Sequence, residues 1–158
     1  MGYSVFLSHG SADAQVAKWI KTNAQTVGIE VYLYEDDPQP GRPLADKLKA
    51  AIQSRDALVV LLTGNSQFST TVHQEIGIAK GLGKRIVPLV QPGFNPRNLA
   101  MLQGVEYIPF DFNDPQTALA TLIAHLQKAK EAKERSEAIG LLALAALIVA
   151  AFSSGGRH

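Results

Sequence analysis

The sequence predicts a flavodoxin-like α/β domain, a doubly wound five-stranded parallel sheet of strand order 2-1-3-4-5, with a C-terminal hydrophobic helix. Short apolar runs alternate with segments of helical periodicity, which is typical of a parallel sheet covered by helices on both faces. The chain has 158 residues, of which 46% are hydrophobic and 18% charged, so one domain with a buried core is expected. A long stretch without charges near the C-terminus predicts the additional helix.

The first two strands and helices follow from the pattern of apolar residues. In order, we expect a strand at residues 3–7, a helix at 13–27, a strand at 29–34 and a helix at 44–54. Gly28 ends the first helix as its C′ residue, and Asp13 is expected to cap the start of that helix. Residues 35–41 form a loop, because two prolines and a glycine cannot continue either element.

The remaining elements continue the alternation. We expect a strand at 57–63, a helix at 71–82, strands at 85–90 and 105–110, and a last helix that begins at Pro115. The run at 57–63 is apolar almost throughout and therefore predicts the central strand. Gly83 ends the helix before the fourth strand, and proline is favoured in a first helical turn such as that of Pro115. Residues 91–103 are expected to be irregular.

This topology places a ligand site before any motif is considered. In the order 2-1-3-4-5 the winding reverses between the first and third strands, and ligands bind beyond the carboxyl ends of the strands at that point. The loops there are residues 8–13 and 64–71. They lack the acidic pair of a response-regulator receiver and the glycine pattern of a dinucleotide-binding fold, so both classes are excluded.

Composition excludes several other kinds of site. The chain has no cysteine, which removes disulfides, thiolate metal sites and cysteine nucleophiles. Its four histidines do not stand at metal-ligand spacings, so no metal site is expected. The 15 basic and 14 acidic residues give a net charge of +1, which predicts no binding to nucleic acid. The lack of cysteine and of a leader before the first strand predicts a cytoplasmic domain.

Three stretches of the chain carry motifs in a particular order and spacing. They are residues 3–9 with a serine near the end, the loop 36–41 followed by a helix ending at 52–56, and residues 66–75. Together they resemble the TIR (Toll/interleukin-1 receptor) domain family, bacterial type, over about residues 3–127. The last stretch resembles the family's serine–tryptophan–x–x–x–glutamate segment, with Glu75 as the glutamate and Thr71 in the place of the tryptophan.

The resemblance implies an enzyme that cleaves the bond between nicotinamide and ribose in NAD. Such an NAD glycohydrolase or cyclase releases ADP-ribose or a cyclic isomer, in bacterial defence or signalling. NAD is then the substrate, and no cofactor is implied. The implied catalytic residue is Glu75. The implied substrate-binding residues are Ser8, His9, Gly41, Phe68, Ser69 and Thr71.

One carboxylate is chemically sufficient for this reaction. Glycosidases generally use two, one of which protonates the leaving group. Nicotinamide leaves a cationic nucleotide as a neutral molecule, so no general acid is required, and Glu75 can act by binding the ribose hydroxyls and stabilising the oxocarbenium ion. Its place near a helix N-terminus has a second explanation, because acidic residues there interact favourably with the helix dipole.

A non-enzymatic function stands beside the enzymatic one. Many enzymatic members of the family have tryptophan where this chain has Thr71. The alternative is an adaptor that binds other TIR domains, or further copies of itself, and is anchored or oligomerised by its C-terminal helix.

The sequence divides into a TIR domain at 1–127, a charged helical linker at 128–137 and a hydrophobic helix at 138–156. Residues 138–152 carry no charge and make a helix of about 22 Å, or about 28 Å with the next four residues, against roughly 30 Å of bilayer hydrocarbon. Two interpretations follow. The helix is a membrane anchor whose basic flank stays in the cytoplasm, or it drives self-association or docks on a partner.

Overall fold

The computed structural model describes residues 2–66, 69–94 and 100–155. Its sheet has five parallel strands in the order β2-β1-β3-β4-β5, which confirms the predicted fold and topology. The strands are β1 (Tyr3–Ser8), β2 (Ile29–Tyr32), β3 (Ala57–Leu62), β4 (Arg85–Val90) and β5 (Ile108–Pro109). The first four lie within two residues of their expected bounds.

The fifth strand is shorter than the strand expected at 105–110. It pairs with β4 over two residues, and the backbone N–H of Val105 instead donates to the carbonyl of Leu102 in a turn, at 3.2 Å. Pro109 has no N–H to donate, so this residue can sit only where the sheet has a free edge. The alternation of apolar residues did not reveal where pairing stops.

Four α-helices connect and cover the strands. They are α1 (Ala14–Gln25), α2 (Leu44–Gln53), α3 (Thr70–Gly81) and α4 (Pro115–Gly155), with short 3-10 turns at Ser11–Asp13, Tyr34–Asp36 and Ala100–Leu102. The first of these turns moves the start of α1 one residue beyond the expected position. Of the irregular region expected at 91–103, residues 95–99 lie outside the described part of the chain.

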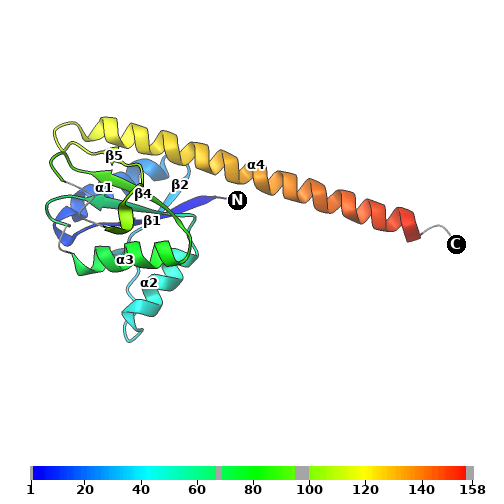
Figure 1. Ribbon diagram of the computed structural model, residues 1–158, viewed down its shortest axis with the longest axis horizontal. Coiled ribbons are helices and arrows are strands. Elements are labelled where there is room, and N and C mark those ends of the chain that lie inside the picture. Colours follow the sequence, from blue (N-terminus) through cyan, green and yellow to red (C-terminus); the bar gives the residue numbers. More distant parts are fainter. Residues whose placement is uncertain (1, 67–68, 95–99, 156–158) are drawn as a thin grey trace.

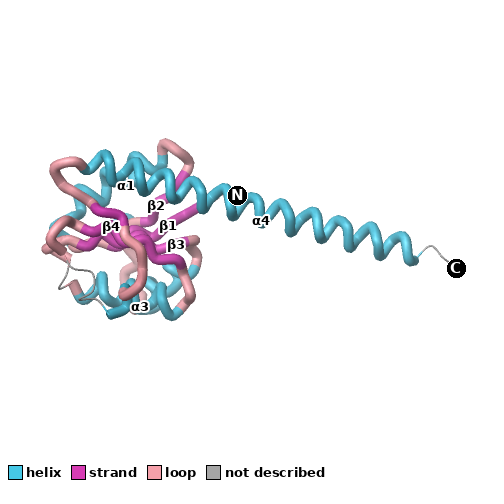
Figure 2. Tube along the Cα trace, turned by 45° about the horizontal axis from the view of Figure 1, so that its top comes forward, coloured by secondary structure: helices cyan, strands magenta, loops and turns pink. Residues whose placement is uncertain are grey.

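The sheet has one helical layer on each face (Figures 1 and 2). Side chains alternate along β1, so that Leu7 packs with α1 and α4 while Phe6 packs with α2 and α3. All six residues of β3 are buried, as expected for the central strand. Two apolar cores therefore hold the carboxyl ends of β1 and β3 in fixed positions.

The C-terminal helix α4 is one continuous element of 41 residues. Its first turns are buried on the sheet through Ala118, Leu119, Leu122 and Leu126. It then leaves the body and projects far beyond it (Figure 1). The segment expected as linker and the segment expected as hydrophobic helix thus share a single helix axis.

The projecting part of α4 carries eight of the eleven large apolar residues that are exposed in the described chain. They are Ile139, Leu141, Leu142, Leu144, Leu147, Ile148, Val149 and Phe152, with exposed fractions from 49% to 80%. By length and composition α4 can cross a membrane, since its most apolar window has a mean hydropathy of 2.2 and none of that window is buried.

Candidate functional site

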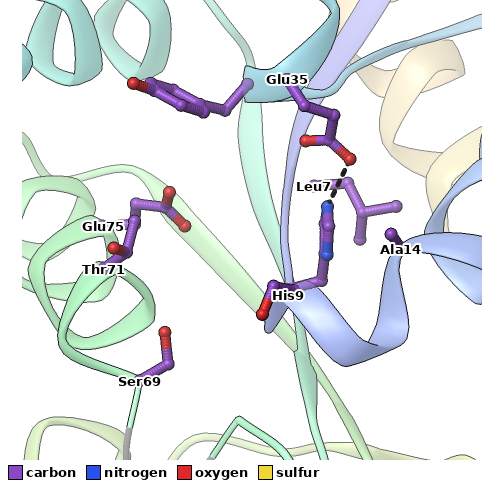
Figure 3. A pocket seen from close by; sticks show the side chains of 9 residues that line it. Leu7, His9, Ala14, Glu35, Ser69, Thr71 and Glu75 are labelled. Carbon is purple, nitrogen blue, oxygen red and sulfur yellow. Dashed lines mark hydrogen bonds and ion pairs between the residues drawn. The ribbon is translucent and has the colours of Figure 1, made fainter.

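A cleft lies at the carboxyl edge of the sheet, where the predicted switch point places it. Its volume is about 360 Å³. The side chains around it come from the end of β1, the start of α1, the turn after β2 and the first turns of α3 (Figure 3). The lining residues are Leu7, His9, Ser11, Ala14, Tyr34, Glu35, Ser69, Thr71 and Glu75.

Glu75 is the buried carboxylate of this cleft, with an exposed fraction of 3%. Ser8, the last residue of β1, donates its hydroxyl proton to the Glu75 carboxylate. Burial raises the pKa of Glu75 to about 7; the bond from Ser8 opposes this rise, and the negative charge of Glu35 adds to it. Near neutral pH the side chain therefore exists in both protonation states.

The start of α3 sets the direction in which Glu75 points. Ser69 is the N-cap of this helix, and its hydroxyl accepts a hydrogen bond from the backbone N–H of Val72 at 3.3 Å. Thr71 and Glu75 are four residues apart and share one face of the helix, so both line the cleft. Thr71 is exposed at its rim, where its short side chain leaves the entrance open.

An ion pair forms the opposite wall of the cleft. The Nε2 atom of His9 lies 2.8 Å from the Glu35 carboxylate, and its Nδ1 atom lies 2.7 Å from the carbonyl of Gly10 (Figure 3). Both ring nitrogens of His9 therefore face acceptor oxygens. This pair connects the turn after β2 to the loop after β1.

A buried polar network joins the two loops at the switch point. The Asp13 carboxylate accepts hydrogen bonds from Thr63 Oγ1 at 2.6 Å and from Asn65 Nδ2 at 3.0 Å. The hydroxyl of Ser66 accepts from the backbone N–H of Thr63 at 2.8 Å. A Cβ atom at Gly10 would lie 3.3 Å from the carbonyl oxygen of Asn65. Only glycine fits this approach without displacing the second loop.

The prediction that Asp13 caps α1 is wrong. The residue stands at the N-cap position, but its side chain makes no capping hydrogen bond. Its carboxylate turns instead toward the loop after β3, where Thr63 and Asn65 supply two donors. Donors from a distant strand satisfy this buried charge, and sequence spacing carries no information about them.

The structure brings together most of the residues that the sequence singled out. Ser8, His9, Ser69, Thr71 and Glu75 lie in or directly behind the cleft. The list of site residues from the sequence also contains Gly41 and Phe68. Gly41 is an exposed turn residue with a φ of 80° and does not line the cleft, and Phe68 lies outside the described residues.

Sequence reasoning missed Glu35 and Tyr34, which both line the cleft. The sequence predicts Tyr34 as the end of a strand and Glu35 as the start of the loop that follows. A signal was present, because β2 is adjacent to β1 in the predicted order and the residues after it must reach the same edge.

A second hollow of about 300 Å³ adjoins the cleft. Tyr34 and Glu35 line both spaces, and Arg42 and Lys47 contribute cations to the second one. Lys47 Nζ lies 3.7 Å from the centre of the Tyr34 ring and donates to the Tyr34 carbonyl at 3.2 Å. Within residues 2–66, 69–94 and 100–155, no group of acidic residues and histidines is arranged to hold a metal ion.

The sequence of the chain and its fold were then compared with known proteins. The family model of the TIR domain matches residues 5–123. The TIR domain of the Toll-related receptor TRR-2 from Hydra magnipapillata has 18% identity and a TM-score of 0.64, with 79% of this chain and 98% of that chain covered. No curated protein matches the chain.

Two further solved structures are similar. The TIR domains of the activated Roq1 resistosome, which recognises the pathogen effector XopQ, have 15% identity and a TM-score of 0.58, covering 81% of this chain and 99% of that chain. The CMP N-glycosidase BcmB of Clostridium botulinum has 20% identity and a TM-score of 0.56, covering 77% and 98%. At these identities the likeness concerns the fold alone.

Proposed function

This chain belongs to the TIR domain family, and from that premise we propose that it cleaves the nicotinamide–ribose bond of NAD, as a glycohydrolase or an ADP-ribosyl cyclase. The observation that carries the proposal is the Glu75 carboxylate, buried beside an open cleft and held by the Ser8 hydroxyl. A buried acid of raised pKa in a cleft marks a functional site more often than a structural one.

The position of Glu75 fits the charge changes of this reaction. The nicotinamide ring of NAD carries a positive charge, which moves to the ribose as the bond breaks. An anion fixed in a cleft of low dielectric constant stabilises that developing charge without reorganising. Approach of the cation also favours the ionised form of Glu75, because an opposite charge nearby lowers the pKa of a carboxyl group.

The shape of the site supports a substrate larger than a nucleoside. The adjoining hollow shares Tyr34 and Glu35 with the cleft, so the two spaces lie next to each other at the turn after β2. Arg42 at the far hollow is an exposed cation suited to a phosphate group. The same fold supports cleavage of an N-glycosidic bond in the CMP N-glycosidase described above.

The test is release of nicotinamide from NAD by the full chain in detergent or in liposomes, with the products separated by chromatography. Glu75→Gln should lower release by at least about a hundredfold, since loss of one preorganised electrostatic contact costs that much. Glu30→Gln, an exposed carboxylate on β2, is the matched control and should retain full activity. Equal release by wild type and folded Glu75→Gln would contradict the proposal.

A second candidate function rests on the rim of the cleft. Thr71 is exposed there and leaves an opening where a larger aromatic side chain would close the entrance. TIR domains typically associate with one another, and a domain with an incomplete cleft can still do so. If nicotinamide is not released even when the chain is clustered at high density, association measured by ultracentrifugation would support the adaptor.

We also propose that the body is cytoplasmic and that the projecting part of α4 is embedded in a membrane. Residues 138–155 give a helix of about 27 Å, close to the roughly 30 Å hydrocarbon thickness. They have no polar face, whereas helices that pair in water keep one. Four basic residues precede them, which is typical of a cytoplasmic flank. These are Lys128, Lys130, Lys133 and Arg135.

Flotation with liposomes tests the embedding. Leu147→Arg places a charge near the centre of the apolar segment at a cost of about 3 kcal/mol, so membrane association should weaken on the order of a hundredfold. Ser136→Arg adds the same side chain to the exposed, already charged part of α4 and should float like wild type. Soluble oligomers that form without lipid and resist both substitutions would contradict the embedding.

A further inference from the structure

The two edges of the sheet carry charges of opposite sign. The amino edge, where the strands begin, presents Lys84 and Arg85 at the start of β4. Arg55 precedes β3, but its guanidinium turns away from this edge onto the Tyr32 ring, at 4.6 Å. The carboxyl edge, where the strands end, is acidic. Its exposed or half-buried carboxylates are Glu35, Asp36, Asp37, Asp111 and Asp114, and Asp13 and Glu75 are buried beside them. Three cations, Lys21, Arg42 and Lys47, offset these charges in part, and Lys21 pairs with Asp36 at 2.8 Å.

Acidic residues of the amino edge reduce its positive charge only in part. Asp56 is paired with Lys133 of α4, at 2.9 Å between Oδ1 and Nζ. Glu106 lies beside Arg85 in a shallow hollow on this edge. Lys130 approaches the same edge beside Gly28. Glu30, exposed near the start of β2, is a further carboxylate of this edge. The excess of basic over acidic side chains here is therefore small, and it lies with Lys84, Arg85 and Lys130.

The helix α4 leaves the body at this basic edge. It begins near the carboxyl edge after β5, runs back along the sheet and passes the N-terminus of the chain (Figure 1). Lys133 fastens it there, because its ammonium group binds both Asp56 and the carbonyl oxygen of Gly2, each at 2.9 Å. Four buried side chains hold the preceding turns. The direction of α4 relative to the sheet is thus fixed before the apolar segment starts.

The distance from the basic edge to the apolar segment is short. Ala138 comes five positions after Lys133 in α4, which corresponds to about 7.5 Å along the helix axis. The headgroup zone of one leaflet is about 5–8 Å thick, by difference between total and hydrocarbon thickness. When the apolar segment lies in the hydrocarbon, the amino edge is at the depth of the headgroups, within the Debye length of about 8 Å over which their charge acts.

We propose that the domain stands on an anionic lipid surface with its basic amino edge against the headgroups and its cleft directed away from the bilayer. The inference rests on the proposed embedding of α4 and is independent of NAD cleavage. The carboxyl edge lies about 20 Å further out, the length of six strand residues. The acidic edge then faces the aqueous phase, and a soluble substrate reaches the cleft without crossing the headgroup layer.

Site-specific labels can measure this orientation, because the chain contains no cysteine and each introduced thiol is unique. Ser54→Cys reports on the amino edge and Gly64→Cys on the carboxyl edge; both positions are exposed, and the space around Gly64 is open. Leu147→Cys reports on the apolar segment of α4. Each full-length variant carries one fluorophore and is reconstituted in phosphatidylcholine vesicles with phosphatidylserine, with a quencher on headgroups or on acyl chains.

The expected result is strong headgroup quenching at position 54, several-fold weaker quenching at position 64, and acyl-chain quenching at position 147. Arg85→Glu should reduce the difference between positions 54 and 64 in vesicles with phosphatidylserine, whereas Lys49→Glu, an exposed lysine on α2, should not. Equal quenching at 54 and 64 with position 147 quenched would overturn the orientation while leaving the embedding intact. A label at 147 that no lipid quencher reaches would overturn both, and neither result bears on nicotinamide release.

Discussion

Two buried carboxylates lie on the same edge of the sheet, and their surroundings differ. Asp13 and Glu75 are each 3% exposed. Asp13 accepts hydrogen bonds from Thr63 and Asn65, and it joins two loops. Glu75 accepts one bond, from Ser8, and faces the cleft. Burial alone therefore does not distinguish these two carboxylates; the donors around them and the open space beside Glu75 do.

The strongest test of this comparison is removal of the structural carboxylate. Asp13→Ala leaves the Thr63 hydroxyl and the Asn65 amide without their acceptor, and bonds to a charged group contribute about 1.5–3 kcal/mol each. We expect the free energy of unfolding to fall by about 3 kcal/mol, measured by urea titration. Asp13→Asn keeps one acceptor oxygen and should lose about half as much. An unchanged midpoint for Asp13→Ala would show that the two loops are held by other contacts.

Removal of the charge of Glu75, the carboxylate that faces the cleft, should have the opposite effect on stability. Its pKa is about 7 in the folded chain and 4.5 in a model peptide, so the folded state binds more protons between these values and loses stability as pH rises through this window. A displacement of that size corresponds to at most about 3 kcal/mol. Because Glu75→Gln also buries a polar amide, we expect it to stabilise the chain by about 2 kcal/mol at pH 8.

The pH dependence provides the control for this prediction. The gain from Glu75→Gln should shrink steadily as the pH falls below 7. Below pH 4.5 wild-type Glu75 becomes protonated in the unfolded as well as the folded state, so only the cost of the buried amide should remain and the variant should be slightly less stable than wild type. Thermal melting of both proteins across this range measures the difference. A gain that does not change with pH would mean that packing, and not the charge of Glu75, is responsible.

The smallest expected effect is a shift in the pKa of Glu75 when the Ser8 hydroxyl, which donates to it, is removed. The Ser8 hydroxyl lowers the pKa of Glu75, so Ser8→Ala should raise it further. If release of nicotinamide needs the ionised carboxylate, kcat/KM of wild type should rise with pH through about 7, and the midpoint should lie at higher pH in Ser8→Ala. Thr22→Ala, at an exposed position of α1, is the control and should keep the wild-type pH profile of kcat/KM. A shift to lower pH would contradict the role given to Ser8.

The sequence was sufficient for the parts of the fold that depend on burial of apolar side chains. The run at 57–63 has one explanation in a parallel sheet, a strand covered on both faces, and its neighbours then follow from the alternation of elements. The cleft followed from the same logic, because the winding order places the end of β1, which carries Ser8, beside the start of α3, which carries Glu75.

The features that the sequence did not reveal depend on contacts between distant residues. The partners of Asp13 are 50 and 52 positions away, and the ion pair of His9 with Glu35 crosses 26 positions. The length of β5 depends on where the neighbouring strand β4 ends, at Val90. The sequence predicted residues 128–137 as a charged helical linker, but their union with the helices on either side into one element of 41 residues was not predicted.

The network that joins the loops after β1 and β3 also constrains how this chain can change over time. Gly10, Asp13, Thr63, Asn65 and Ser66 each contact another member of the set. Substitutions at such positions are expected to be non-additive, because each alters the partners left to the others. Drift at one position is therefore tolerated only together with a matching replacement in the opposite loop. The two loops are therefore expected to accept substitutions as a pair and not one at a time.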